Sequence, residues 1–391
     1  MVTIRPVRQA LVPVDTEAAE RISALSEDVL QGDLPDEAFE WVAESLAQIE
    51  ESPLTRVTED VLIVYEIVDP HREGVRQIGV GGMAVTGQIR TEKKPFGTIV
   101  RNEGIREEKV RGQARLIQRT GAFTGMVNLA VEDLDGRFAI ALLAYADTEP
   151  EDFHATDDRG CIHRVWLEDD PKTISDLAAA LAREPLAYVA DGNHRTAAAA
   201  AAGLDEFPAV FFPAGTMGLA PHNRLVEGPR MPLREMLPAL ERGFRVESLP
   251  GVRAFQPAVT HEIGLYGFRE WRRLTPLEGT YDPASAVETV DADIVQRRFF
   301  DEVLGIHDPR DGRLTFVGGD RSASYLRRRV DSGEFAYAVT LPPVTMEQFL
   351  RVCRQGRFMP PKSTWFQPKV LLGLVTALAG ASSRGRGCSA A

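Results

Sequence analysis

The chain has 391 residues, of which 44% are hydrophobic and 26% are charged, and its formal net charge is −12. This is ordinary globular composition, with enough apolar residues for two or three packed units. The negative charge argues against general binding to nucleic acid or to anionic membranes. No secretory leader and no apolar run of about eighteen residues is present, so we expect a cytoplasmic protein without a membrane segment.

The three cysteines, Cys161, Cys353 and Cys388, lack the spacing of metal ligands, and their odd number fits a reducing compartment. We expect neither a disulfide framework nor a structural zinc. His163 near Cys161 would suit a thiol nucleophile, but the alternation of apolar and polar residues up to Trp166 favours a strand.

Hydrophobic periodicity predicts alternating helices and strands, which is typical of a mixed α/β (α+β) fold. Two helical patterns occupy residues 16–49 and are separated by the break at Gly32 to Pro35. Strands are expected at 61–68, 77–88, 126–131 and 138–146, and an amphipathic helix at 107–118. Gly79-Val80-Gly81-Gly82 lacks dinucleotide-binding spacing, and we interpret it as strand geometry.

Further along the chain, expected helices cover 173–183, 294–304 and 345–354, and expected strands cover 186–190, 207–212 and 335–341. We therefore expect five segments: an N-terminal helical segment (1–60), a phosphate-binding core (61–232), a subdomain or insertion (233–289), a C-terminal α/β block (290–380) and a disordered tail (381–391).

The central stretch Asp191-Gly192-Asn193-His194-Arg195-Thr196 connects an apolar run to six alanines, Ala197 to Ala202. It predicts a strand, a tight turn and a helix start. Glycine permits positive φ or a close backbone approach, and the helix N-terminus favours an anion. An ordinary turn can also contain Asp-Gly-Asn, but an imidazole and a guanidinium directly after it favour a phosphate site.

A second informative stretch runs from Met359 to Lys369 and contains three prolines. The prolines exclude a helix interior and predict a stiff loop that presents Lys362, Ser363 and Thr364. Loop residues on a rigid scaffold often bind ligands or catalyse reactions. The alternative is a proline-rich surface loop with ordinary polar residues.

Together, the two stretches resemble the domain-of-unknown-function 1015 family, whose members carry Asp-Gly-His-His-Arg centrally and Met-Pro-(Pro/Gln)-Lys-Ser-Thr-x-Phe-x-Pro-Lys near the C-terminus. Asn102-Glu103, Asn223-Arg224 and Asp293-Ile294-Val295 extend the agreement. The resemblance covers the chain from Tyr65 to Val375. The resemblance to members related to free-serine kinases implies a ParB/sulfiredoxin-like nucleotide-binding core with additional α/β elements.

The chain departs from the family pattern at two histidines, which are replaced by Asn193 and Asn102. Asparagine keeps a hydrogen-bonding side chain but cannot titrate, so neither position can supply a general base or a cation. The N-terminal residues match poorly, and the nearest stand-in for the family's Pro-Tyr-Asp element is Val12 to Asp15.

The resemblance implies a kinase of amino-acid metabolism that uses ATP or ADP with Mg²⁺ to phosphorylate the hydroxyl of free L-serine or a related hydroxy amino acid. Phosphoryl transfer needs charge neutralisation, a metal bridge and a group that orients or deprotonates the acceptor. Asp191 and Glu103 are the alternative bases or Mg²⁺ ligands, and Asn223 and Arg224 would bind the substrate. The expected nucleotide-binding and phosphate-binding residues are Gly192, Asn193, His194, Arg195, Thr196, Lys362, Ser363 and Thr364.

Two other functions remain open because the same turn would bind phosphate in each. One is a nucleotide-binding regulatory protein that acts as a ParB-like switch without turnover. The other is a phosphatase or nuclease that uses the same anion site. The expected partners are a nucleotide and a small hydroxy amino acid, not nucleic acid or a membrane. The oligomeric state is open, with a homodimer as one option.

Overall fold

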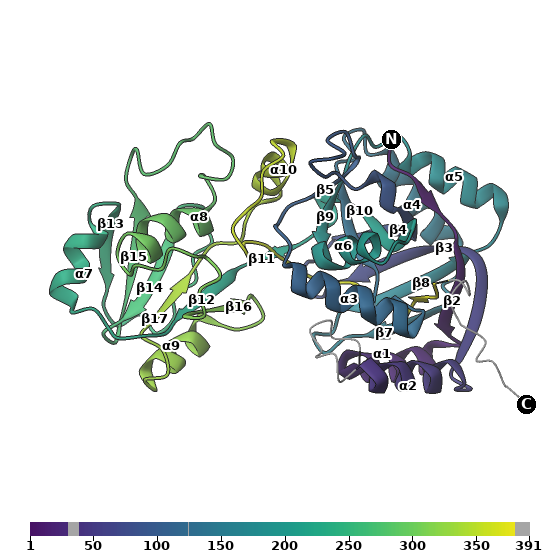
Figure 1. The fold of residues 1–391 in the computed structure, drawn as a ribbon, viewed down its shortest axis with the longest axis horizontal. Helices are drawn as coiled ribbons and strands as arrows, with labels where there is room; N and C mark the ends of the chain where they lie inside the picture. Colours follow the sequence, from purple (N-terminus) through teal and green to yellow (C-terminus); the bar gives the residue numbers. More distant parts are fainter. Residues whose placement is uncertain (30–38, 124, 380–391) are drawn as a thin grey trace, which may run out of the picture. The chain divides into compact units, whose positions relative to one another are not determined.

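The computed structural model describes residues 1–29, 39–123 and 125–379. These residues form two compact units, and the segments of each can be followed in Figure 1. Unit 1 contains Met1–Arg101, Ile105–Met217 and the C-terminal segment from Pro368, and unit 2 contains Asn102–Gly104 and Gly218–Gln367. The expected core and the expected C-terminal block therefore each contribute to both units. The expected break at 32–35 and the expected tail at 381–391 lie outside the described residues.

Unit 1 is built on one large mixed sheet. Its strands are β1 (Ile4–Arg5), β2 (Val7–Pro13), β3 (Thr55–Val68), β4 (Arg76–Val85), β5 (Ile99–Arg101), β6 (Val127–Val131), β7 (Phe153–Thr156), β8 (Ile162–Glu168), β9 (Ala187–Asp191), β10 (Glu206–Pro213) and β19 (Thr376–Ala377). The main strand order is β19-β2-β3-β4-β10-β6-β9-β5; β8 pairs with β3, β7 with β8, and β1 with β4. The β6–β10 and β5–β9 pairs are parallel.

Most strands predicted for this unit are confirmed, including the one that follows Cys161. The stretch predicted as 77–88 ends as a strand at Val85 and continues as the short 3₁₀ helix η2 (Thr86–Gln88). Gly82 allows β1 to approach β4 closely, because a Cβ at this position would lie 2.5 Å from the Arg5 carbonyl oxygen. The interpretation of the glycine-rich stretch as strand geometry is therefore confirmed.

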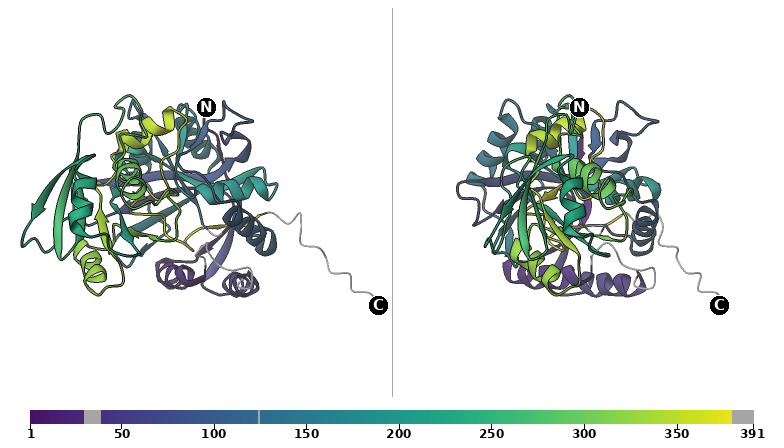
Figure 2. Two further views of the ribbon diagram at one scale, coloured as in Figure 1. Left: turned by 60° about the vertical axis from the view of Figure 1, so that its left-hand side comes forward. Right: turned by 90° about the vertical axis from the view of Figure 1, so that its left-hand side faces the viewer.

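Helices cover the sheet of unit 1. They are α1 (Thr16–Val29), α2 (Phe39–Glu50), α3 (Glu107–Thr120), α4 (Arg137–Thr148), α5 (Pro171–Leu181) and α6 (Asn193–Ala201), with the short η3 (Ala214–Thr216) after β10. Figure 1 shows α3 and α6 side by side on the sheet, and Figure 2 shows α1 and α2 lying next to each other. The two N-terminal helical patterns and the helices predicted at 107–118 and 173–183 are confirmed.

The strand predicted at 138–146 is wrong, because these residues form helix α4. Phe138 and Leu142 are buried four residues apart, whereas Ile140 between them is exposed, which is helical periodicity. The Asp133 carboxylate accepts hydrogen bonds from the N–H groups of Phe138 and Ala139, each at 2.9 Å, and so caps the first turn. A short apolar run does not distinguish a strand from a helix, and the cap lies outside the run.

Unit 2 contains an antiparallel sheet with the strand order β13-β15-β14-β17-β12-β16. Its strands are β12 (His222–Val226), β13 (Phe244–Leu249), β14 (Ile263–Gly267), β15 (Glu270–Pro276), β16 (Leu314–Gly318) and β17 (Tyr337–Thr340). A separate short ladder joins β11 (Leu219–Ala220) to β18 (Trp365–Phe366). Strands from the expected subdomain at 233–289 thus lie in one sheet with β12, β16 and β17.

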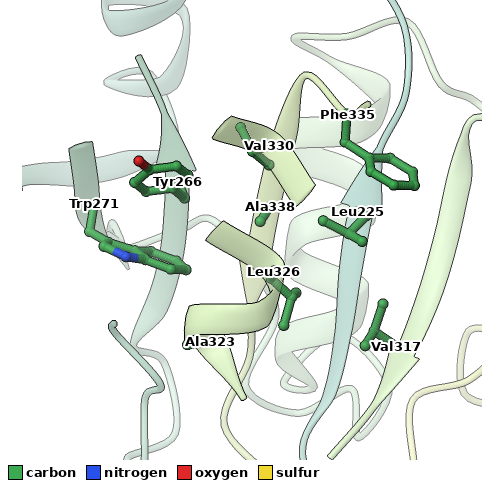
Figure 3. Close-up of a cluster of buried hydrophobic side chains, with 9 residues drawn as sticks. All are labelled: Leu225, Tyr266, Trp271, Val317, Ala323, Leu326, Val330, Phe335 and Ala338. Carbon is green, nitrogen blue, oxygen red and sulfur yellow. The ribbon is translucent and has the colours of Figure 1, made fainter. Parts of the chain in front are cut away.

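The helices of unit 2 are α7 (Leu233–Leu240), α8 (Asp291–Val295), the π-helix η4 (Gln296–Asp301), α9 (Ala323–Asp331) and α10 (Met346–Arg354). The helix predicted at 345–354 is confirmed, and Thr345 begins it with a reciprocal capping box to Gln348. Figure 3 shows α9 packing its apolar side chains against the sheet in a cluster of Leu225, Tyr266, Trp271, Val317, Ala323, Leu326, Val330, Phe335 and Ala338. Both units are therefore mixed α/β structures with their own cores.

Candidate functional site

The predicted strand, turn and helix around Gly192 are confirmed. Asp191 is the last residue of β9, and α6 begins at Asn193. Gly192 has φ +101°, and a Cβ there would lie 3.2 Å from Arg195 Nε and 3.2 Å from Val127 Cγ2. Only glycine fits this turn without strain, so the positive end of α6 begins directly beside the Asp191 carboxylate.

The Asp191 carboxylate lies between two cations. Arg195 Nη2 donates to Asp191 Oδ2 at 2.6 Å, and Lys369 Nζ donates to Asp191 Oδ1 at 3.0 Å. The same guanidinium donates through Nη1 to the carbonyl oxygen of Met126 at 2.7 Å. Because each cation is held by protein contacts, the cluster of Asp191, Arg195 and Lys369 presents a net positive charge in a fixed place.

Lys369 ends the second motif of the sequence, and no role is predicted for it there. A buried chain of hydrogen bonds holds its segment: the Leu371 N–H donates to the Tyr65 hydroxyl at 3.0 Å, and this hydroxyl lies 2.9 Å from His163 Nδ1. His163 Nε2 lies 3.4 Å from the Asp157 carboxylate. Burial raises the pKa of Tyr65, so the hydroxyl stays protonated and can donate to His163. The only sequence signal for Lys369 was its place in the motif.

Other predicted residues of the turn make contacts within the protein. His194 Nε2 accepts a hydrogen bond from the backbone N–H of Arg106, which precedes α3, at 3.1 Å. The buried Thr196 hydroxyl donates to the Gly192 carbonyl oxygen at 2.9 Å, and Asn193 is also buried. Of the predicted phosphate-binding residues in this turn, Arg195 thus places its charged group in the cluster. Phosphate binding by the other residues of the turn stays a prediction.

In unit 2, Arg224 organises the loop that carries Lys362. Its guanidinium is buried, lies 4.5 Å from the centre of the Phe316 ring, and donates to the carbonyl oxygens of Lys362 at 2.9 Å and Pro361 at 3.5 Å. Lys362 has φ +57°, a left-handed conformation that is uncommon for a side-chain-bearing residue. Burial lowers the pKa of Arg224 to about 9, and the nearby Glu103 carboxylate opposes this shift. The predicted stiff loop is therefore held by a buried cation.

The structure also brings Asn102 and Glu103 to this loop. The Asn102 side-chain amide donates to the Thr364 hydroxyl at 3.3 Å, although 262 positions separate the two residues. Glu103 forms a β-bridge with Met359. The Ser363 hydroxyl donates to the Pro360 carbonyl oxygen at 2.7 Å, so it stabilises the turn.

Asn223 is fully buried and bonded at both ends of its amide. It donates to Gln256 Oε1 at 3.0 Å and accepts from the Leu341 N–H at 3.0 Å. In this structure Asn223 and Arg224 fix the scaffold around the loop. Their direct binding of a substrate stays a prediction.

The profile of a family described as a protein of unknown function (DUF1015) matches residues 19–297. The chain belongs to this family. The match includes the turn after β9 and Asn223-Arg224, and it ends before the segment from Met359 to Lys369. No curated protein matches the chain.

Several solved structures resemble this DUF1015 protein at low identity. Free serine kinase in complex with AMP has 13% identity and a TM-score of 0.39, covering 69% of this chain and 83% of that chain. A conserved hypothetical protein from Pyrococcus furiosus has 13% identity and a TM-score of 0.35, covering 69% and 87%. C-terminally truncated SbnI from Staphylococcus aureus has 11% identity and a TM-score of 0.39, covering 73% and 86%. These values assign no role to any residue here, and a likeness to ParB or sulfiredoxin stays a prediction.

The cluster of this DUF1015 protein fits an anion better than a metal ion. Mg²⁺ requires carboxylate oxygens that can face it, but both oxygens of Asp191 already face cations. Among the residues that the structure describes, no group of three or more His, Cys, Asp or Glu side chains could hold a metal ion. Asp191 in this position therefore does not fit the predicted role of a Mg²⁺ ligand. For Glu103, the same role stays a prediction.

Two further predictions concern the cysteines and membranes. Cys161 is fully buried, and burial raises the pKa of its thiol to about 12, which opposes a nucleophilic role. Across the described ranges, no helix combines the length and the apolar character needed to cross a membrane.

Proposed function

We propose that this protein is a phosphotransferase that moves a phosphoryl group from ATP or ADP to the hydroxyl of free serine or a related hydroxy amino acid. The resemblance of its two motifs to family members related to free-serine kinases supports the choice of nucleotide and acceptor. The observation that carries the proposal is the cluster of Asp191, Arg195 and Lys369 at the start of α6.

The cluster has the charge and geometry that a phosphate needs. Two cations and one carboxylate give a net charge of about +1, and the helix N-terminus adds roughly half a positive charge. Arginine suits phosphate oxygens because its planar fork can donate two parallel hydrogen bonds, and lysine adds a point charge. The side chains of Arg195, Asp191 and Lys369 are 22%, 27% and 42% exposed, so all three are accessible to a ligand.

The remaining residues take the following proposed roles. Asp191 fixes the two cations and is one candidate for the group that accepts the proton of the hydroxyl. Glu103 is the other candidate. Lys362, which Arg224 holds through the loop backbone, neutralises negative charge that develops during transfer.

The test is incubation with ATP or ADP, Mg²⁺ and a panel of free hydroxy amino acids, followed by phosphorus NMR. A new phosphomonoester resonance that depends on the amino acid is the expected result. Free phosphate alone would mean hydrolysis, and nucleotide binding without turnover would mean a regulatory role; either result would overturn the kinase proposal. A variant with Arg195→Ala should lose the product, whereas Arg111→Ala, which removes an exposed arginine from an (i, i+4) pair with Glu107, should keep it.

A further inference from the structure

Asn128 lies directly across the sheet from Asp191. Strands β6 and β9 are antiparallel, and the register pairs Asn128 with Asp191 and Leu129 with Val189. One residue of β9, Ala190, is therefore extra, so the ladder has a bulge at this point. Bulges re-aim side chains and often occur beside active sites. Residues paired across a ladder project from the same face of the sheet, so the Asn128 side chain lies on the same face as the Asp191 carboxylate.

The Asn128 amide is buried without a bonding partner for its oxygen. The residue is 2% exposed, and Oδ1 accepts no hydrogen bond from any residue in the described ranges. An unsatisfied buried acceptor destabilises the folded protein, because it has lost its hydrogen bonds to water without a replacement. The neighbouring residues of β6 are apolar and buried, and an apolar side chain of equal size would avoid this cost. The unpaired amide oxygen of Asn128 is therefore not needed to form strand β6.

We propose that Asn128 binds the acceptor substrate, with its Oδ1 accepting a hydrogen bond from the hydroxyl or ammonium group of a free hydroxy amino acid. This inference rests on the proposed function and adds a recognition residue to it. The amide oxygen repels phosphate oxygens, so Oδ1 requires a ligand that brings an N–H or O–H donor. Because Asn128 lies opposite Asp191, the donor that it binds lies next to the cluster to which we assign phosphate binding.

The substitution that tests the proposal is Asn128→Leu, which keeps the side-chain size and removes the polar atoms. Because the oxygen has no protein partner, the melting temperature should stay the same or rise. Isothermal titration with L-serine, L-threonine and L-homoserine, each with and without AMP, measures acceptor binding without requiring turnover. We expect the dissociation constant of the best amino acid to rise at least tenfold and that of AMP to change less than twofold.

Gln77 of β4 provides a matched control. It is also a buried amide of the same sheet, and neither its Nε2 nor its Oε1 has a hydrogen-bonding partner among the described residues. Gln77 is separated from β9 by β10 and β6 in the strand order. Gln77→Leu should therefore leave amino-acid affinity unchanged.

The outcomes separate this inference from the proposed function. If wild-type protein binds a hydroxy amino acid and Asn128→Leu does not, the inference stands even when phosphorus NMR detects no product, and only the kinase proposal fails. If both proteins bind the amino acid equally, Asn128 is not an acceptor-binding residue. The inference is also overturned if wild-type protein binds none of the amino acids in the presence or absence of AMP.

Discussion

Lys369 donates a hydrogen bond to the Asp191 carboxylate across a sequence separation of 178 positions. Asp191 ends a strand, whereas Lys369 lies in the segment that returns to unit 1 near the C-terminus. The contact joins the two motifs that stand out in the sequence, at the position where a helix N-terminus favours an anion.

Lys369→Ala should weaken nucleotide binding by about tenfold or more, because a charge-assisted hydrogen bond contributes roughly 1.5–3 kcal/mol. Titration with ATP and ADP measures this change. Lys172→Ala is the control, since Lys172 also pairs with an aspartate at 2.9 Å but lies on the exposed surface of α5. The assignment of Lys369 to phosphate is wrong if both variants bind nucleotide like the wild-type protein.

Asp191→Asn and Arg195→Ala should separate chemistry from binding. Arg195→Ala removes a cation from the cluster and should lower nucleotide affinity by about 1.5–3 kcal/mol. Asp191→Asn keeps the shape but removes the charge, so it should lower kcat far more than affinity if Asp191 accepts the proton. Equal losses of affinity in the two variants would show that Asp191 acts only by holding the two cations, and would leave Glu103 as the base.

Gly192→Ala should destabilise the protein by about 1–3 kcal/mol, because alanine at φ +101° is strained and its Cβ would press on Arg195. Nucleotide affinity should fall as well, since the strain is next to the cluster. Gly112→Ala is the opposite case: Gly112 lies inside α3 with no atom within 4 Å of an added Cβ, so the change should stabilise by roughly 0.5–1 kcal/mol. Thermal and chemical unfolding of both variants check these signs. A Gly192→Ala protein as stable as the wild type would contradict the described turn.

Lys362→Ala should reduce kcat/KM by at least tenfold, which requires the loss of only about 1.4 kcal/mol of transition-state stabilisation. The melting temperature should stay nearly unchanged, because substitutions on the surface usually alter stability by less than about 0.5 kcal/mol. Unchanged turnover in a folded variant would show that the loop is purely structural.

Arg224→Lys tests whether Arg224 acts through this loop. The guanidinium donates through Nη2 to the carbonyl oxygens of Pro361 and Lys362 and through Nη1 to that of His222. A single ammonium lacks this second nitrogen, so kcat/KM should fall. The double variant with Lys362→Ala should be no worse than the more damaged single variant, because the two residues act as one unit. Additive losses would instead indicate that Arg224 contacts the substrate directly.

The Asp291 carboxylate should make stability depend on pH. Burial raises its pKa from 3.8 to about 6, although the backbone N–H of His261 donates to it and opposes the shift. The folded protein therefore binds this proton more tightly than the unfolded chain, and the free energy of unfolding should fall by about 2–3 kcal/mol as pH rises from 4 to 6. Asp291→Asn should remove this component of the pH dependence, measured by urea unfolding. Identical pH profiles of the two proteins would contradict the shift.

Local patterns predicted much of the secondary structure. The turn at Gly192 was predictable because a strand, a glycine and an alanine-rich helix follow one another within a few residues. The error at α4 has a local cause as well: Phe138 begins an apolar run that fits either a strand or a helix, and the cap at Asp133 decides between them.

The sequence by itself determined the alternation of helices and strands, the glycine turn between β9 and α6 and the stiff loop, because each depends on residues that are neighbours in the chain. Only the tertiary structure decided that Lys369 pairs with Asp191, that Arg224 holds the Lys362 loop and that the Asn128 oxygen is buried without a partner. These relationships depend on strand order and register, which bring together residues separated by up to 178 positions in these contacts. Hydrophobic periodicity indicates which face of an element is apolar, but it does not indicate which distant side chain packs against that face.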